Sequence, residues 1–566
     1  MIPMSLLSSR SPLLHPIAAA LVLAGLAPLA SAQTPPDAGT ILQQLQPALP
    51  APPATSAPSL KLEPRAESAL PQSAPFEVKR LQITGNTVFA TESLHELVAG
   101  EEGKSLTLAQ VNTLAERITR YYHQQGYPLA RAIIPAQTIR DGVVVIQVVE
   151  ARYGQVRLNN QSAVRDSLLQ ATLDGLQSGA VIEDDALNRS LLLLSDVPGV
   201  AVAATLQPGA SVGSSDVTVN TTTNPTTLGT VALDNYGNRY IDRVRVSGNL
   251  NVVNPLRHGD LLSATVLSTG SGMNYGRLSY DILVNGQGTH VGTAYSYLRY
   301  KLGSELSALG ANGTASVVSL WGRHPLLRSR EANVYAQLQL DGKRLHDHVD
   351  ASALRTDRHL LNWVMSLNGD IRDNLLAGGI SIWSLGWTSG RVFFDDAAAA
   401  SADAAAGQTR GGFAKWNANF SRLQGISPRD AVYLNLAAQW SDSNLDSAEK
   451  MTAGGPYTVR AYDIGAMSGD IGYVGTVEWR HELGNAWSGQ WQAIAFLDSA
   501  YVKVNQRQWT SGENSGSLSG AGVGMNWSGP DQWRASISVA TRVGARPSLA
   551  ASQPSVRGWV TLSKAF

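Results

Sequence analysis

Residues 226–566 alternate between polar and apolar side chains, yet they contain no apolar run long enough for a membrane helix. In 431–440, for example, Val432, Leu434 and Leu436 share one parity with the other apolar residues. A β-strand has a period of two, so such segments place one face in lipid and the other in a polar lumen. The pattern predicts an outer-membrane β-barrel.

A soluble β-sandwich would also alternate, but three features favour the barrel. The inward parity repeatedly carries charged residues, which a dry sandwich core would not accommodate. All 13 Trp lie after residue 320, as expected for aromatic girdles at membrane interfaces. The chain also ends on an aromatic residue, Phe566, after a strand-like run.

The composition excludes several functions. The 44 basic residues balance the 44 acidic ones, so nothing indicates a nucleic-acid partner. The absence of Cys excludes disulfides, thiol catalysis and thiolate metal sites, and it suits a chain that crosses an oxidising periplasm. We expect no cofactor, no metal and no enzymatic activity.

The N-terminal region reads as three short segments. Residues 1–32 have the charged start, apolar stretch and Ala-Ser-Ala cleavage site of a signal peptide. Residues 33–46 include a short amphipathic helix with Ile41, Leu42 and Leu45 on its apolar side. Residues 47–75 are rich in Pro and Ala, which predicts an extended linker and no packed element.

Residues 76–152 predict a small α+β unit in the order strand, helix, helix, strand, strand. Its second helix starts at Thr107 with a capping-box pattern and ends at Gly126. Strands follow at 130–134 and 143–149. The same order repeats in 153–223, so two such units precede a barrel at 224–566.

These features resemble the two-partner secretion transporters, the TpsB proteins of the haemolysin secretion/activation type. The two units are similar to the POTRA domains of that family, and the similarity covers nearly the whole mature chain. The motifs that carry it are Gly126-Tyr127-Pro128, Ile134-Pro135-Ala136-Gln137, Ser195-Asp196-Val197-Pro198-Gly199, Leu233-Asp234-Asn235-Tyr236-Gly237, Asn254-Pro255-Leu256 and His324-Pro325-Leu326-Leu327-Arg328-Ser329.

A further block, Val459-Arg460-Ala461-Tyr462, is similar to the family's V-R-G-Y/F motif, which lies on a loop that folds back into the barrel. Phe496 and Asp498 resemble the strand motif whose carboxylate holds that loop arginine. Ala461 and Ala500 depart from the family, where Gly is usual. Because Ala tolerates a positive φ poorly, the backbone is expected to be sensitive at both positions. One interpretation is that the two changes compensate each other.

The resemblance implies a transporter that secretes, and in some members activates, a large exoprotein. It implies about 16 antiparallel strands in the outer membrane, with the POTRA units in the periplasm and 33–46 as a plug helix in the pore. Other expected partners are outer-membrane lipid and the barrel assembly machinery, which would read Phe566 in the terminal strand. We expect the exoprotein to pair with POTRA strand edges by β-augmentation. The edge residues are Ala130, Arg131, Ile133, Val143 and Val145.

Two alternatives stay open. A barrel-assembly or insertion factor of the same superfamily would carry more POTRA units and would leave the plug and linker unexplained. A passive porin would lack soluble domains ahead of the barrel, so residues 76–222 argue against it. The sequence does not identify the exoprotein.

Overall fold

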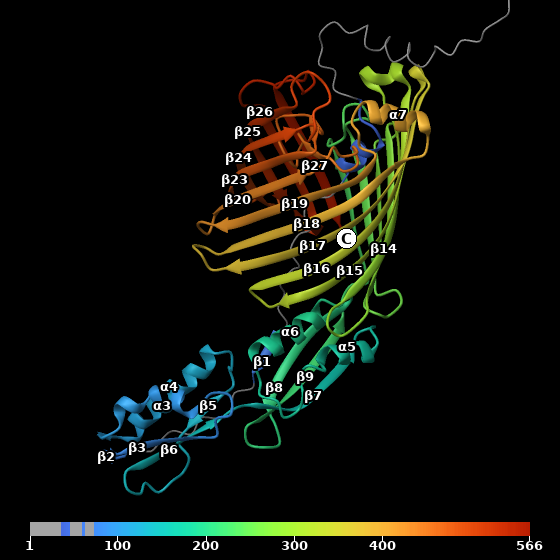
Figure 1. The fold of residues 1–566 in the computed structure, drawn as a ribbon. Coiled ribbons are helices and arrows are strands. Elements are labelled where there is room, and N and C mark those ends of the chain that lie inside the picture. The colour runs from blue at the N-terminus through green and yellow to red at the C-terminus, as the bar shows by residue number, and fades with distance from the viewer. Residues whose placement is uncertain (1–34, 46–58, 63–72) are drawn as a thin grey trace, which may run out of the picture.

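We describe the protein from a computed structural model, for residues 35–45, 59–62 and 73–566. The predicted signal peptide lies outside these residues. In 224–566, all of which are described, sixteen antiparallel strands form a closed barrel, which confirms the predicted fold class (Figure 1). The barrel strands are β10 (Thr227–Asp234), β11 (Arg245–Val253), β12 (Asp260–Ser268), β13 (Met273–Leu283), β14 (His290–Lys301), β15 (Ala311–Arg328), β16 (Ala332–Val349), β17 (Leu354–Asp373), β18 (Gly379–Phe394), β19 (Gly411–Gly425), β20 (Asp430–Ser441), β23 (Ile471–Ala486), β24 (Gly489–Lys503), β25 (Ser515–Ser528), β26 (Trp533–Arg542) and β27 (Val556–Ala565).

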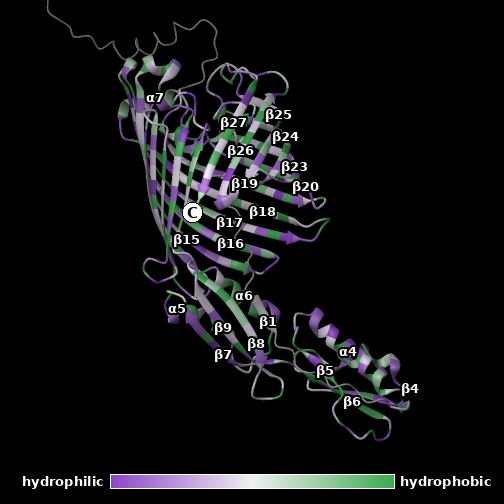
Figure 2. Ribbon diagram, turned by 180° about the vertical axis from the view of Figure 1, so that it is seen from behind, coloured by the Kyte–Doolittle hydropathy of each residue, from purple (hydrophilic) through white to green (hydrophobic). Residues whose placement is uncertain are grey.

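The alternation seen in the sequence places apolar residues outside and polar residues inside the barrel, and Figure 2 shows the two kinds mixed along each strand. On β14, Tyr295 and Tyr297 are exposed on the outer wall, whereas Ser296 and Leu298 are buried on the inner side. The sheet closes where β10 pairs with β27, from Thr230 opposite Ala565 onward. Closure leaves the barrel wall without a free strand edge, as lipid requires.

The first predicted POTRA unit has its own core. Its sheet order is β3-β6-β5, with the pair β2–β4 beside it. Helix α4 begins after Thr107, whose side chain and that of Gln110 form the predicted capping box. The elements are β2 (Phe76–Val78), β3 (Arg80–Thr84), α3 (Thr91–Glu96), η1 (Ala99–Glu101), β4 (Lys104–Leu106), α4 (Leu108–Gln124), β5 (Arg131–Ile133) and β6 (Val143–Val149).

The second unit contains an unexpected strand. Residues 59–62, inside the predicted linker, form β1 (Ser59–Leu62) and pair in parallel with β8. The prediction that 47–75 contributes no packed element is therefore wrong at this point. The sheet order is β1-β8-β9-β7. Its other elements are β7 (Arg152–Gln161), α5 (Asp166–Leu173), α6 (Asp184–Ser195), β8 (Val200–Pro208) and β9 (Ser214–Thr223).

The two units follow one another below the barrel, with the second unit against its lower rim (Figure 1). Arg328, at the lower end of β15, donates from Nε and Nη2 to both oxygens of Asp196 at 2.7 and 2.8 Å. Leu283, at the end of β13, packs into the core of the second unit. Two of the sequence motifs, around Asp196 and Arg328, thus form the joint between this unit and the barrel.

Two segments fill the barrel lumen. Helix α2 (Ala38–Gln44) lies inside, and the chain between β20 and β23, residues 442–470, folds inward beside it with the short strands β21 (Met451–Ala453) and β22 (Met467–Gly469). We call residues 442–470 the pore loop. The remaining short helices are η2 (Ser304–Leu309), η3 (Asp350–Ser352), α7 (Ala397–Ala405) and η4 (Pro530–Gln532). Among the described residues, no helix is both long and apolar enough to span a bilayer.

Candidate functional site

The tip of the pore loop is fastened to the barrel wall by Arg460. Its Nε and Nη2 atoms donate to the two oxygens of Asp498, each at 2.9 Å, and its backbone N–H donates to Asp498 Oδ2 at 3.0 Å. The guanidinium carbon lies 3.2 Å from the centre of the Phe496 ring. The motif residues Arg460, Phe496 and Asp498 therefore meet in space, in a bidentate geometry that only arginine can form.

A second carboxylate, which the sequence interpretation missed, completes this contact. Arg460 Nη1 donates to Glu478 Oε2 at 2.6 Å. Glu478 lies on β23 opposite Phe496 of β24, so both side chains point into the lumen. Its other oxygen accepts a hydrogen bond from Arg480 Nε at 2.8 Å. The sequence signal for this contact is an acidic residue at an inward-facing position of the neighbouring strand.

The two departures from the family motif are accommodated without unusual backbone. Neither Ala461 nor Ala500 has a positive φ. The Ala461 methyl group instead faces Gly520 on β25, where a Cβ atom would lie only 2.6 Å from it. Ala500 lies opposite Val474 and Leu518 in the adjoining strands. Ala461 and Ala500 lie in one buried apolar cluster, and the interpretation that they compensate each other stays a prediction.

The flanking motif residues anchor the same tip. Val459 and Tyr462 are fully buried in one apolar cluster with Phe496. Trp559 of β27 donates from Nε1 to the carbonyl of Arg460 at 2.7 Å. Asp463 accepts from Arg557 of β27 at 2.6 Å. The loop tip is thus tied to the terminal strand of the barrel as well as to β23 and β24.

An arginine of β17 joins the plug helix α2 to its surroundings. The three nitrogens of Arg358 donate to Asp37 at 2.7 Å, to Asp347 at 2.7 Å and to Asp446 at 2.6 Å. Asp37 is the N-cap of α2 and also accepts from the Thr40 N–H at 2.9 Å. Because Asp347 belongs to the barrel wall and Asp446 to the pore loop, Arg358 joins helix, wall and loop.

The remaining contacts of α2 are close. Ile41 is fully buried in a cluster with barrel residues. Leu42 and Leu45 are partly exposed and pack against that cluster. Gly39 lies directly on the pore loop, since a Cβ atom there would be 2.3 Å from Ser447 Oγ. Gln43 Nε2 donates to the carbonyl of Ala448. The helix therefore rests on the loop and on the wall at once.

The pore loop carries a second buried ion cluster. Glu449 accepts from Lys343 Nζ at 2.6 Å and lies 3.0 Å from Lys415 Nζ. Lys343 and Lys415 belong to β16 and β19, so they extend inward from separate parts of the wall. Buried charges of this kind are stable only when paired. The loop thus supplies the counter-charges for cations that line the lumen.

The predicted partner-binding residues of the first POTRA unit fall into two groups. Ala130, Arg131 and Ile133 lie at or beside β5, which is an edge strand, although its Ala132 N–H already donates to Thr119 Oγ1 of α4 at 2.9 Å. Ile133 is exposed on this edge.

Val143 and Val145 lie on β6, the central strand, so the prediction of a free edge at these two residues is wrong. The chain that follows β5 folds over them. The Gln137 side chain bonds both backbone groups of Val145 at 2.8 Å, and Val143 N–H donates to the Arg140 carbonyl at 3.0 Å. The backbone groups of β6 that extend beyond the end of β5 are therefore already hydrogen-bonded within the chain.

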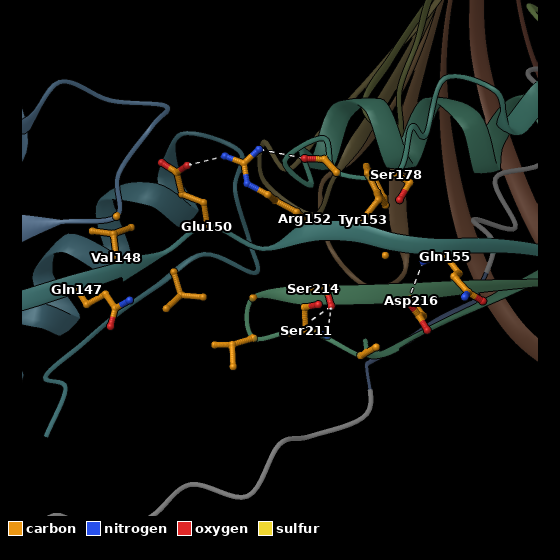
Figure 3. A pocket seen from close by; sticks show the side chains of 17 residues that line it. Gln147, Val148, Glu150, Arg152, Tyr153, Gln155, Ser178, Ser211, Ser214 and Asp216 are labelled. Carbon is orange, nitrogen blue, oxygen red and sulfur yellow. Dashed lines mark hydrogen bonds and ion pairs between the residues drawn. The ribbon is translucent and has the colours of Figure 1, made fainter.

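A cavity of about 530 Å³ lies where the two POTRA units meet (Figure 3). Beside it, the buried Glu150 accepts from the N–H groups of Thr87 and Val88 at 2.7 and 2.8 Å and lies 3.5 Å from Arg152 Nη2. Burial by itself raises the pKa of Glu150, but these hydrogen bonds outweigh it and hold the pKa below its ordinary value. Burial also raises the pKa of Tyr153 to about 12.

Phe566 closes the barrel. Its backbone exchanges two hydrogen bonds with Gly229, at 2.8 and 2.9 Å. Its ring lies over that glycine and is 57% exposed. The terminal residue therefore belongs to the seam between β10 and β27 and presents an apolar ring outward.

Comparison with known proteins agrees with this architecture. Residues 76–151 match the model of the ShlB-type POTRA domain, and residues 213–527 match that of the haemolysin secretion/activation protein ShlB/FhaC/HecB. The heme/hemopexin transporter protein HuxB of Haemophilus influenzae is 26% identical over 83% of this chain and 84% of its own. The outer membrane transporter CdiB of Escherichia coli is 24% identical over 82% and 79%.

Solved structures show the same fold. CdiB from Escherichia coli superposes with a TM-score of 0.70 at 21% identity, over 89% of this chain and 93% of that one. CdiB from Acinetobacter baumannii gives 0.62 at 15% identity, over the same shares. The barrel, the POTRA unit and the family match lead to one conclusion. The chain belongs to the ShlB/FhaC/HecB family and is an outer-membrane transporter of two-partner secretion, with its POTRA domains in the periplasm.

Proposed function

We propose that the partner exoprotein crosses the barrel lumen in an extended form, after α2 leaves and the pore loop moves aside. The observation that carries this proposal is the position of Arg358, which binds Asp37 of the helix and Asp446 of the loop together. Both elements occupy the lumen, so a chain can pass only once these contacts break. The helix and the loop share one guanidinium, so a change at Arg358 releases a contact of each.

The partner first engages the first POTRA unit at the outer edge of β5. An incoming strand would pair with this edge by β-augmentation, and Ile133 would contribute a side-chain contact. The corresponding edge of β8 in the second unit is already paired with β1, so an incoming strand can use it only after β1 leaves. We therefore assign the first contact to β5.

The cargo in this proposal is a large secreted exoprotein. The relative HuxB carries the name of a heme/hemopexin transporter, whereas the name of the transporter CdiB gives no cargo. No residue is assigned a catalytic role, and no cofactor is needed. Folding of the exoprotein outside the cell would oppose its return. During biogenesis, the exposed ring of Phe566 is proposed as the feature read by the barrel assembly machinery.

The proposal is tested by site-specific crosslinking, which is possible because the chain has no Cys. Ile133→Cys places a thiol on the β5 edge, and Ile139→Cys is the matched control in the following turn. Their parent side chains are 41% and 38% exposed. We expect crosslinks to the exoprotein in transit from position 133 and few from position 139. Equal crosslinking at both positions would contradict the assignment to β5.

A further inference from the structure

The outer wall of β14 to β18 changes from apolar to basic toward the extracellular end. On β14, Tyr295 and Tyr297 are followed by Arg299 and Lys301. On β17, which runs in the opposite direction, Arg355 precedes Leu361. The five exposed cations of this region are Arg299, Lys301, Arg344, Arg355 and Arg391, and we call them the basic belt.

The strand register establishes that these side chains point away from the lumen. Residues directly opposite in antiparallel strands share a face. Arg299 lies opposite Thr314, and Thr314 opposite His346, which extends the outward row from β14 to β16. The alternate parity faces the lumen, where Lys343 binds Glu449 and Arg358 binds Asp37. The belt is therefore on the membrane side of the wall.

Three acidic residues nearby lie against histidines. Asp357 lies 2.9 Å from His346, Asp395 lies 2.6 Å from His359, and Asp350 lies 2.9 Å from His348. Within residues 35–45, 59–62 and 73–566, none of the five belt cations forms an ion pair with a carboxylate. Carboxylates therefore lie in this region, but the five belt cations have no direct carboxylate partner among the described residues.

A cationic row that directly adjoins an apolar, lipid-facing wall matches a molecule that carries both anionic groups and acyl chains. Acyl chains would lie along Tyr295, Leu361 and their neighbours, which are exposed on the outer wall. Phosphate groups at the head of the same molecule would then meet the guanidinium groups, which bind phosphate in a bidentate manner. A water-soluble acidic peptide would satisfy the cations but would gain nothing from the apolar wall beside them.

We propose that the basic belt is a binding site for a phosphorylated glycolipid of the outer leaflet, of the lipid A type. This site is independent of the lumen and of the translocation route. Its expected role is to fix the orientation and depth of the wall formed by β14 to β18 in the outer leaflet.

The test uses the full-length transporter purified in mild detergent. Arg344→Gln with Arg355→Gln removes two belt cations. The matched control, Arg257→Gln with Arg330→Gln, removes two exposed arginines from the turns at the periplasmic end. Native mass spectrometry with added bisphosphorylated lipid A measures retention. We expect retention to fall about ten-fold in the belt variant, the loss that two solvent-exposed charge contacts give, and to be unchanged in the control.

A second measurement uses the unaltered protein, so it does not depend on how the variants fold. Bisphosphorylated lipid A should raise the Tm of the transporter, and dephosphorylated lipid A should not. Equal retention in both variants, or equal stabilisation by the two lipids, would overturn the proposal. Heat-dependent gel mobility establishes that each variant has an intact barrel before binding is compared.

Discussion

Replacement of Arg460 by Ala should free the tip of the pore loop while the barrel stays assembled. The side chains of Arg460, Glu478 and Asp498 are 10%, 7% and 0% exposed, so the contacts are largely shielded from water. Removing one partner of such a buried pair costs about 3–5 kcal/mol. Arg460→Ala leaves two carboxylates without their shared cation, so we expect the upper end of that range.

Asp498→Ala should cost less, because Arg460 keeps its 2.6 Å contact with Glu478. The double variant should be no worse than Arg460→Ala alone, since Glu478 then still has Arg480 as a partner at 2.8 Å. The expected coupling between Arg460 and Asp498 is about 2–3 kcal/mol, within the range for residues in one buried network. Arg460→Lys should restore only part of the loss, because an ammonium cannot bond both carboxylates as a planar fork does.

Hydrogen exchange of the amides in 455–463 measures the free energy of loop opening directly. Exoprotein in the medium, normalised to transporter in the outer membrane, measures the functional consequence. Additive effects of Arg460→Ala and Asp498→Ala in both assays would refute the reasoning, because additivity would show that the two residues act independently.

Three other perturbations follow from the structure. Gly39→Leu should expel α2, because its side chain would collide with Ser447, and planar-bilayer conductance should rise; unchanged conductance would show that the helix is not seated as described. Arg328→Ala should detach the second POTRA unit from the barrel by leaving Asp196 unpaired at the joint, measured as faster hydrogen exchange in α6; unaltered exchange would contradict this joint. The pKa of Glu150 is lower in the folded protein, so its stabilising contribution should be present above its ordinary value of 4.5 and be lost as pH falls through the folded pKa; Glu150→Gln should abolish that part of the pH dependence of Tm, and identical pH profiles would refute it.

The barrel could be predicted from the sequence because strand alternation is a local property. The contact of Arg460 with Asp498 could be predicted because both lie in motifs that resemble a known family. Glu478 and Arg358 were missed for a common physical reason. Many inward positions carry a charge, and which of them meet depends on strand register and on how the pore loop folds back, neither of which is encoded locally.

The errors also have physical causes. The segment 59–62 has only four residues and lies between prolines, so it shows no periodic pattern that would predict a strand paired with β8. The prediction of a free edge at Val143 and Val145 is wrong because the order of strands in the sheet is not visible in the sequence. The sequence also does not show that the Gln137 side chain occupies the backbone groups of Val145. Long-range pairing decided each of these outcomes.

The central claim is that α2 must leave the lumen before the exoprotein can pass. Ala38→Cys and Asp347→Cys place thiols where the helix meets β16, since the Ala38 N–H donates to Asp347 Oδ1 at 2.8 Å. A short reducible crosslink between them should stop secretion, reduction should restore it, and Ala38→Cys alone with the same reagent should secrete normally. Undiminished secretion by the crosslinked transporter would contradict the claim.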